Sequence, residues 1–205
     1  MPGSDAADEH LRRADPVMAA LIAENGPLGP PRPPTGPYAA LVRAIVGQQL
    51  SVRAAEAIHQ RLLERYEGHE PTPAEILAED PDALREAVGL SRAKTTFLRS
   101  LAEHVESGAL DLEHLDAHSD EEISAKLMAI KGIGAWTAQI FLMFQLGRPD
   151  VLAAGDLGLR RAVERAYELP DLPSTGELEA LAGPWHPYRT RACRHLWQSL
   201  QNQPA

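Results

Sequence analysis

The sequence predicts an all-α fold, and three observations support this prediction. Apolar residues recur at intervals of three and four positions along several segments, as they do on one face of a helix. Helix start signals, in which a capping residue is followed by proline or by glutamate three positions later, occur throughout the chain. No segment of useful length alternates apolar and polar residues as a strand would. With 205 residues, of which 44% are hydrophobic, the chain can bury the core of one compact unit or of two small lobes.

The first segments are predicted as a frayed end, a helix and a connector. Residues 1–14 are polar and are expected to be frayed. Asp15 followed by Pro16 is an N-cap with proline at the first helical position, and this helix is expected to end at Asn25. The segment 27–37 contains six prolines and is therefore expected to be extended.

Two apolar helices are predicted on either side of a short loop, Gln48-Gln49-Leu50. Residues 38–48 form the first helix, and Ser51 caps a second helix that runs to Tyr66. A loop tip between two buried helices is well placed to enter a minor groove, where an inserted side chain can fill the gap left by an extruded base. The alternative is a plain connection between helices.

Three further helices are predicted to start at Thr72-Pro73, at Asp80-Pro81 and at Ser91. The third of these runs to Glu106, and its Lys94 and Arg99 are interpreted as cations that could reach phosphate.

A helix-hairpin-helix is predicted in the centre of the chain. A capping box at 119–122 starts its first helix, and the second carries apolar residues at helical spacing after a turn at 131–134, KGIG. The two glycines permit a tight turn, while Ile133 packs between the helices. Free N–H groups at the start of the Ala135 helix, aided by its dipole, then make a site for a backbone phosphate. Ordinary corners between helices also use glycine, so this turn alone leaves both interpretations open.

A carboxylate, Asp156, stands immediately before another predicted helix. Asp is a preferred N-cap, and it is also suited to act as a catalytic carboxylate held at a helix start beside flexible glycines. Both roles can hold at once. Ser174 or Thr175 is predicted to cap a short helix after it, and Pro187 to start the last helix, which runs to Leu200.

Charge and composition limit the class of protein. A formal net charge of −9 argues against a protein that coats nucleic acid non-specifically, because duplex affinity comes largely from Lys and Arg. Segment 103–122 carries eight acidic residues and no Lys or Arg, whereas 184–205 carries three Arg, two His and no acid. A locally basic face is compatible with salt-sensitive DNA binding. The alternative is an ordinary solvated surface.

The single cysteine and the polar N-terminus exclude further classes. Cys193 alone cannot form an intramolecular disulfide or supply the four thiolates of an iron–sulfur cluster. No run of 18 apolar residues occurs and no secretory signal is visible, so a cytoplasmic, nucleoid-associated location is expected.

Four motifs taken together resemble a known family. The stretch IKGIGAWTA at 130–138, followed at this spacing by Gly155-Asp156, resembles the signature of the helix-hairpin-helix DNA glycosylases. The other three matches are GQQLS at 47–51, GLSRAK at 89–94 and WHPYRTRA at 185–192. In this order they are similar to the 3-methyladenine DNA glycosylase II (AlkA-type) branch, over residues 35–200.

The resemblance implies a two-lobed helical fold with an active-site cleft between the lobes. Its expected parts are an N-terminal helix and connector at 1–36, a helical lobe at 37–110, and a hairpin lobe with the last helix at 111–205, on which the N-terminal segment is expected to pack. The chain leaves no room for the N-terminal β-rich domain that this branch often adds.

The resemblance also implies an activity and a set of site residues. The expected activity is excision of alkylated purines (3-methyladenine and also 7-methylguanine) by hydrolysis of the N-glycosidic bond, with Asp156 as the catalytic carboxylate and an abasic site as the product. Bifunctional members carry a Schiff-base lysine just after the second hairpin glycine, where this chain has Trp136, so no lyase activity is expected. The substrate pocket is expected to be formed by Trp136, Trp197, Ile140 and Leu157, and the DNA-binding residues to be Gln48, Gln49, Leu50, Lys131, Gly132, Ile133, Gly134 and Ala135. Either Gln49 or Leu50 would be the wedge.

The expected partner is double-stranded DNA that contains alkylated bases, bound by a monomer away from membranes. No cofactor is required, although the backbone carbonyls of Met128, Ile130 and Gly132 are candidate ligands of a structural monovalent cation. The alternative function is a non-catalytic helix-hairpin-helix DNA-binding module. Asp156 and the tryptophan motifs argue against it, because a module that only holds the DNA backbone needs neither.

Overall fold

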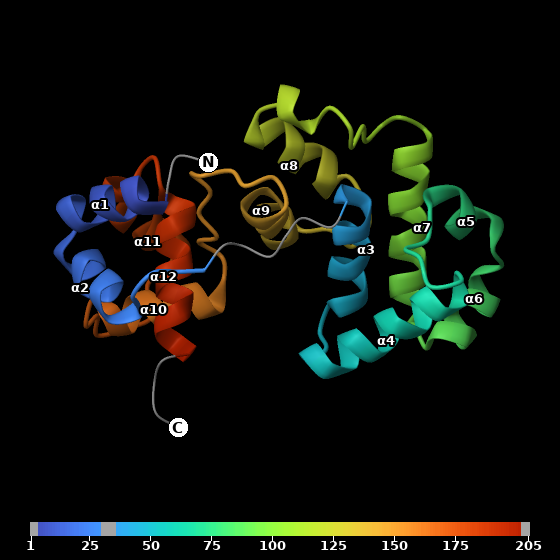
Figure 1. Cartoon of the computed structure of the whole chain (residues 1–205), viewed down its shortest axis with the longest axis horizontal. Helices are drawn as coiled ribbons and strands as arrows, with labels where there is room; N and C mark the ends of the chain where they lie inside the picture. Colours follow the sequence, from blue (N-terminus) through green and yellow to red (C-terminus); the bar gives the residue numbers. More distant parts are fainter. Residues whose placement is uncertain (1–3, 30–35, 202–205) are drawn as a thin grey trace. The chain divides into compact units, whose positions relative to one another are not determined.

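The structure is a computed structural model that describes residues 4–29 and 36–201. In these residues it contains twelve α-helices, two short 3-10 helices and no strand, which confirms the all-α prediction (Figure 1). The chain divides into two compact units. The first unit contains residues 1–33 and 142–205, and the second contains residues 34–141.

The first unit is assembled around its last helix. Helix α12 contacts α10, α2 and α1, and the side chains that these helices bury include Leu11, Met18, Leu159 and Leu196, each 0% exposed. The elements of this unit are α1 (Ser4–Ala14), α2 (Pro16–Asn25), α10 (Leu157–Ala166), α11 (Thr175–Leu181), the 3-10 helix η2 (Gly183–Trp185) and α12 (Arg189–Gln201).

Helix α1 corrects the prediction that residues 1–14 are frayed. The buried Asp8 carboxylate accepts hydrogen bonds from Nε and Nη2 of Arg191, both at 2.6 Å, and lies 2.9 Å from Nε2 of His195. Leu11, on the same helix, is completely buried. Burial against α12 compensates the conformational entropy that a short terminal helix loses when it forms. No residue near α1 in the sequence indicates this contact.

Asp15 connects three elements of the first unit. Its Oδ1 caps α2 as predicted, accepting from the backbone N–H groups of Val17 and Met18 at 2.9 and 3.2 Å. Its Oδ2 accepts from Nε1 of Trp185 at 2.9 Å and from the hydroxyl of Tyr167. Trp185 is 0% exposed, so it is a core residue that fixes the N-terminal helices.

The second unit is arranged around α7. This helix contacts α3, α5 and α6, and α4 contacts both α3 and α6 (Figure 1). Every predicted cap in this unit accepts a backbone N–H, namely Ser51, Thr72, Asp80, Ser91 and Ser119. The elements are α3 (Pro37–Gly47), α4 (Val52–Arg65), α5 (Pro73–Ala78), α6 (Pro81–Val88), α7 (Arg92–Glu106), η1 (Leu115–Ala117) and α8 (Asp120–Met128), followed by α9 (Ala135–Phe144), which begins in this unit and ends in the first.

The division between the units differs from the expected boundary between residues 110 and 111. The backbone N–H of Lys131 donates to Oγ of Ser100 at 3.2 Å, and Nε2 of Gln48 donates to the carbonyl of Gly132 at 2.7 Å. The hairpin is therefore held by α7 and by the loop after α3, and it belongs with residues 34–141. Most of the predicted proline-rich connector, residues 30–35, lies outside the described residues.

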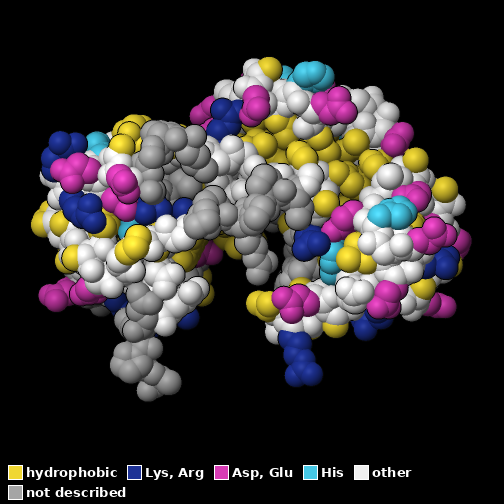
Figure 2. Space-filling view, viewed as in Figure 1, with side chains coloured by type: hydrophobic (Ala, Val, Ile, Leu, Met, Phe, Trp, Pro, Cys, Tyr) yellow, Lys and Arg dark blue, Asp and Glu magenta, His cyan; other side chains and the backbone are white. Residues whose placement is uncertain are grey.

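The surfaces of both units mix charges of both signs (Figure 2). On the second unit, hydrophobic side chains gather between α8 and α7 in this view. Across residues 4–29 and 36–201, no helix combines the length and the apolar character that a membrane span needs. The last helix begins at Arg189 rather than at Pro187, a difference of two positions that is common at helix ends.

Candidate active site and nucleic-acid interface

The two hairpin glycines have different roles. Gly132 adopts a φ of 84°, and a Cβ added to it would lie 2.1 Å from Cδ2 of Phe97, so only glycine fits there. Gly134 has no positive φ and no heavy atom within 4 Å of its would-be Cβ. Ile133 is 5% exposed and packs inward as predicted. Gly134 therefore leaves open space at the start of α9, where a phosphate would approach the backbone N–H groups of the first turn.

The loop after α3 is tied to this hairpin. Its first residue, Gln48, makes the hydrogen bond to the Gly132 carbonyl, and the backbone N–H of Leu50 closes a turn onto the carbonyl of Gly47 at 3.2 Å. Gln49 has a φ of 56°, an uncommon value for a residue other than glycine and one that is often found at functional sites. Gln49 and Leu50 are both exposed, so each can serve as the predicted wedge.

The candidate cation ligands already take part in hydrogen bonds. The carbonyl of Gly132 accepts from Gln48, and that of Ile130 accepts from the backbone N–H of Ile133 at 3.1 Å. A carbonyl oxygen has two lone pairs, so each of these two groups could still accept a cation. These two carbonyls and that of Met128 stay candidate ligands, and cation binding stays a prediction.

Trp136 and Ile140 lie one turn apart on α9. Trp136 is 50% exposed, which excludes the interpretation of this tryptophan as a core residue, and Ile140 is half-buried. An exposed indole on the first turn of the helix that follows the hairpin can stack on a base or attract a cation.

Asp156 is both an N-cap and the acceptor of a tryptophan N–H. Its Oδ1 caps α10 by accepting from the backbone N–H of Leu159 at 2.6 Å, and it also accepts from Nε1 of Trp197 at 2.9 Å. Trp197 stands on α12, and its ring centroid lies 6.2 Å from that of Phe144. The helix start and the indole together hold the carboxylate in one orientation.

The residues that flank Asp156 leave little room behind the carboxylate. A Cβ at Gly158 would lie 3.1 Å from Oδ1 of Asp156 and 3.9 Å from the Trp197 ring, so glycine lets the carboxylate and the indole come close to α10. Leu157 is 48% exposed, and Gly155 is exposed as well. The carboxylate therefore has an apolar neighbour at the surface.

The segment before Asp156 is anchored to the start of α12. The Val151 N–H donates to Oγ1 of Thr190 at 3.0 Å, and Oγ1 of Thr190 donates to the Arg148 carbonyl at 2.7 Å. The Asp150 carboxylate accepts from Nε of Arg189 at 2.8 Å. These anchors were missed by the sequence analysis, although Arg189-Thr190 lies within one of its motifs.

A scan against protein-family models decides the family. Residues 42–187 match the model described as HhH-GPD superfamily base excision DNA repair protein. The chain belongs to the HhH-GPD superfamily.

Relatives of this HhH-GPD protein match nearly its whole length. The alkylbase DNA glycosidase-like protein mag2 of Schizosaccharomyces pombe is 32% identical, over 94% of this chain and 92% of the relative. DNA-3-methyladenine glycosylase 1 of the same yeast is 36% identical, over 94% of this chain and 86% of the relative. The solved structure of the 3-methyladenine DNA glycosylase Mag1 of that yeast, in complex with abasic DNA, matches with a TM-score of 0.86 and 35% identity, covering 96% of this chain and 97% of that one.

The arginines of the C-terminal segment have partners within the fold, which weakens the interpretation of 184–205 as a basic face for DNA. Arg189 binds Asp150, Arg191 is buried against Asp8, and Nη2 of Arg194 donates to the Gly29 carbonyl at 2.6 Å. These side chains stabilise the first unit of the HhH-GPD fold.

Lys94 and Arg99 of α7 are also engaged within the fold. Nζ of Lys94 donates to the Val46 carbonyl at 2.8 Å, and burial lowers the pKa of this amine. Nη1 of Arg99 donates to the carbonyls of Ile76 and Glu79 at 3.2 and 3.1 Å. Lys94 thus holds the end of α3 and Arg99 the end of α5, so both cations have a structural role, and phosphate binding by them stays a prediction.

Each unit gathers part of the predicted site. The first unit brings together Asp156, Leu157 and Trp197. The second unit brings the loop 48–50 to the hairpin 131–135, with Trp136 and Ile140 following on α9.

Proposed function

We propose that the chain is a base-excision-repair DNA glycosylase that flips alkylated purines out of duplex DNA and hydrolyses their N-glycosidic bond. The observation that carries this proposal is the Asp156 carboxylate, held by the start of α10 and by Trp197 in a chain of the HhH-GPD superfamily. The proposed substrate is 3-methyladenine, with 7-methylguanine as a second one. Relatives that match over most of this chain carry the name of a 3-methyladenine glycosylase.

Cleavage of an N-glycosidic bond builds positive charge on C1′ and the ring oxygen. A fixed carboxylate lowers the energy of this oxocarbenium-like state and can orient the attacking water. Water adds to C1′ while the electron pair of the breaking C1′–N bond passes to the base. A cationic methylated purine thereby leaves as a neutral molecule, a proton of the water is released, and the sugar becomes an abasic site. Asp156 is proposed as the catalytic residue.

Trp136 favours damaged bases in this proposal. An indole face attracts a cation by ~0.5 to 2 kcal/mol, depending on desolvation, so it distinguishes a cationic methylated purine from a normal base. Ile140, Leu157 and Trp197 are proposed as the remaining pocket residues. Because an indole cannot form a Schiff base with the sugar, the enzyme is proposed to be monofunctional.

The hairpin and its neighbouring loop hold the DNA in this proposal. The N–H groups at the start of α9 bind a backbone phosphate, and Gln49 or Leu50 enters the minor groove. Hydrolysis needs only water and the carboxylate, so no cofactor is proposed beyond a structural cation at the carbonyls of Met128, Ile130 and Gly132. The protein is proposed to act as a monomer. Its proposed location is the cytoplasm, in association with the nucleoid.

The proposal is tested by incubating the protein with alkylated duplex DNA and measuring the released bases. The wild type is expected to release 3-methyladenine, and Asp156→Asn is expected to lose at least ~10²-fold in single-turnover rate, because it removes the charge that stabilises the transition state. Asn keeps the size and the capping capacity, so melting temperature and duplex affinity should persist.

Two results would contradict the assignment. Excision by Asp156→Asn at the wild-type rate would remove the catalytic role of Asp156, and duplex binding without any base release by the wild type would favour the non-catalytic DNA-binding module. The same reactions, treated with borohydride, are expected to give no protein–DNA adduct, and a strong adduct would place the enzyme in the bifunctional class.

A further inference from the structure

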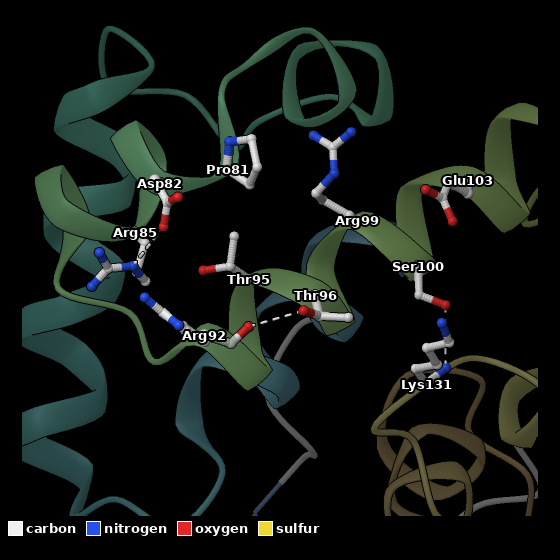
Figure 3. A pocket seen from close by; sticks show the side chains of 10 residues that line it. All are labelled: Pro81, Asp82, Arg85, Arg92, Thr95, Thr96, Arg99, Ser100, Glu103 and Lys131. Atoms are coloured by element: carbon white, nitrogen blue, oxygen red, sulfur yellow. Dashed lines mark hydrogen bonds and ion pairs between the residues drawn. The ribbon is translucent and has the colours of Figure 1, made fainter.

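A polar cavity of 480 Å³ lies beside the hairpin in the second unit. It is lined by one face of α7, by the start of α6 and by Lys131, the residue immediately before the hairpin glycine (Figure 3). We call it the α7 pocket. Its lining includes Arg85, Arg92, Arg99 and Lys131 against the acids Asp82 and Glu103, a local excess of positive charge on a chain whose net charge is −9.

Two of these four cations are engaged within the fold and two are not. Arg85 forms ion pairs with Asp82 and with Glu86, at 3.2 and 2.8 Å. Arg99 donates to the carbonyls at the end of α5, as described above. The side-chain nitrogens of Arg92 and Lys131 make no hydrogen bond or ion pair with any residue in the part of the chain that the structure describes.

Ser100 adds a buried donor beside Lys131 at the hairpin end of the pocket. It is 5% exposed, and its Oγ accepts the backbone N–H of Lys131 at 3.2 Å. Its own hydroxyl proton has no acceptor among the described residues. By contrast, the hydroxyls of Thr95 and Thr96 donate to backbone carbonyls one turn earlier. The pocket therefore offers an ammonium, a guanidinium and a hydroxyl, which together match the acceptor oxygens of phosphate.

The free donors are spread along α7 rather than gathered at one point. Arg92 and Ser100 are eight positions apart, which corresponds to about 12 Å along a helix. Figure 3 shows Ser100 beside Lys131, with Arg92 further along the same helix. A single phosphate is too small to reach both ends, whereas one DNA strand carries a phosphate at about every 3.4 Å of helix axis.

We propose that the α7 pocket binds backbone phosphates of duplex DNA, with Lys131 and Ser100 on one phosphate and Arg92 on another of the same strand. The DNA-binding surface then extends from the hairpin along α7. This inference rests on the proposed function only in taking duplex DNA as the partner. Phosphate contacts carry no sequence information, so the pocket contributes affinity and register and does not select the lesion.

The test is the salt dependence of binding to undamaged duplex DNA, measured by fluorescence anisotropy for Arg92→Ala and Lys131→Ala. Each variant is expected to reduce the slope of log K against log salt by about 0.9, because one phosphate contact and its released counterion are lost. Arg92→Lys should retain the slope. Arg12→Ala, which removes an exposed cation of α1 that lines no part of this pocket, is the matched control and should leave the slope unchanged.

Replacing Glu103 is expected to raise the affinity for duplex DNA, whereas replacing Arg92 or Lys131 is expected to lower it. Its carboxylate lines the pocket and repels phosphate, so Glu103→Gln should bind the duplex more tightly at low salt. Melting temperatures measured for each variant check that the fold is intact.

Unchanged slopes in both Arg92→Ala and Lys131→Ala, or a change equal to that of the Arg12→Ala control, would overturn the inference. Unchanged slopes together with NMR shifts of the Ser100 and Lys131 amides on addition of inorganic phosphate would assign the pocket to free phosphate instead, and would overturn it as well. Binding to undamaged duplex involves no base excision. Unchanged salt slopes would therefore leave the glycosylase proposal untouched, and a protein that excises no base could still be tested for these phosphate contacts.

Discussion

Trp197 contacts the candidate catalytic carboxylate, Asp156, directly. The indole N–H and the backbone N–H of Leu159 converge on the same carboxylate oxygen. A hydrogen bond to a charged group contributes about 1.5–3 kcal/mol, so losing one donor changes both the orientation and the electrostatics of the carboxylate. We therefore propose that Trp197 is a positioning residue for Asp156 in addition to its proposed place in the pocket.

Trp197→Phe tests this pairing, because it keeps an aromatic ring near Phe144 and removes only the N–H donor. We expect the single-turnover excision rate to fall by about 10- to 100-fold, the kinetic equivalent of one hydrogen bond to a charge. The control is the same substitution in the Asp156→Asn background, where it should have little further effect. Equal losses in the two backgrounds would mean that Trp197 acts independently of Asp156.

At the scale of elements, the fold requires glycine at position 132 of the hairpin but not at position 134, where we propose that a phosphate approaches. Gly132 has a positive φ and faces the Phe97 ring, whereas Gly134 faces open space. The sequence by itself does not distinguish the two glycines. The distinction depends on α7, which places the Phe97 ring against the turn.

The two glycines are therefore expected to respond differently to alanine. Gly132→Ala should destabilise the protein by about 1–3 kcal/mol, since it combines overpacking with an unfavourable φ. Gly134→Ala should melt like the wild type but bind undamaged duplex about tenfold more weakly, a loss of ~1.4 kcal/mol, because the new methyl group occupies the space at the α9 amides. Thermal melting of both variants measures the change in stability, and titration with undamaged duplex measures the change in affinity. Wild-type affinity in Gly134→Ala would show that no phosphate approaches there.

Across the whole molecule, the N-terminal and C-terminal helices are joined by a buried charged network. Burial opposes ionisation of Asp8, but its contacts with Arg191 and His195 outweigh burial and lower the pKa of this carboxyl. Burial also lowers the pKa of His195, despite the Asp8 carboxylate. Nδ1 of His195 lies 3.2 Å from Nδ2 of Asn25, an amide nitrogen that can only donate, so the neutral ring accepts at Nδ1 and donates from Nε2 to Asp8.

This network makes the fold sensitive to acid. Below about pH 6.5 the unfolded chain takes up a proton at His195 that the folded chain resists, so stability decreases as pH falls, and Asp8 adds a further loss below about pH 4. We expect the melting temperature to fall between pH 7.5 and pH 5.5, by about 2–4 °C for each kcal/mol lost. His195→Gln should show a smaller fall over this interval, and an equal fall would exclude His195 as its source.

Local signals determined most of the secondary structure and the candidate catalytic residue. Ser51, Ser91 and Asp156 cap the helices that follow them, as the sequence predicts, because a cap depends only on residues within one turn. The hairpin turn and the family resemblance were visible for the same reason, since each motif is a short contiguous stretch.

Only the tertiary structure decided which charges are free and which helices pair. Arg191 and Asp8 are separated by 183 positions, and Trp197 and Asp156 by 41, so no local pattern could connect them. The sequence marks an arginine as a cation but does not say whether a carboxylate or a carbonyl lies within reach in the fold. For this reason Lys94 supports α3, whereas Arg92 has no side-chain partner among the described residues, although the two stand in one motif.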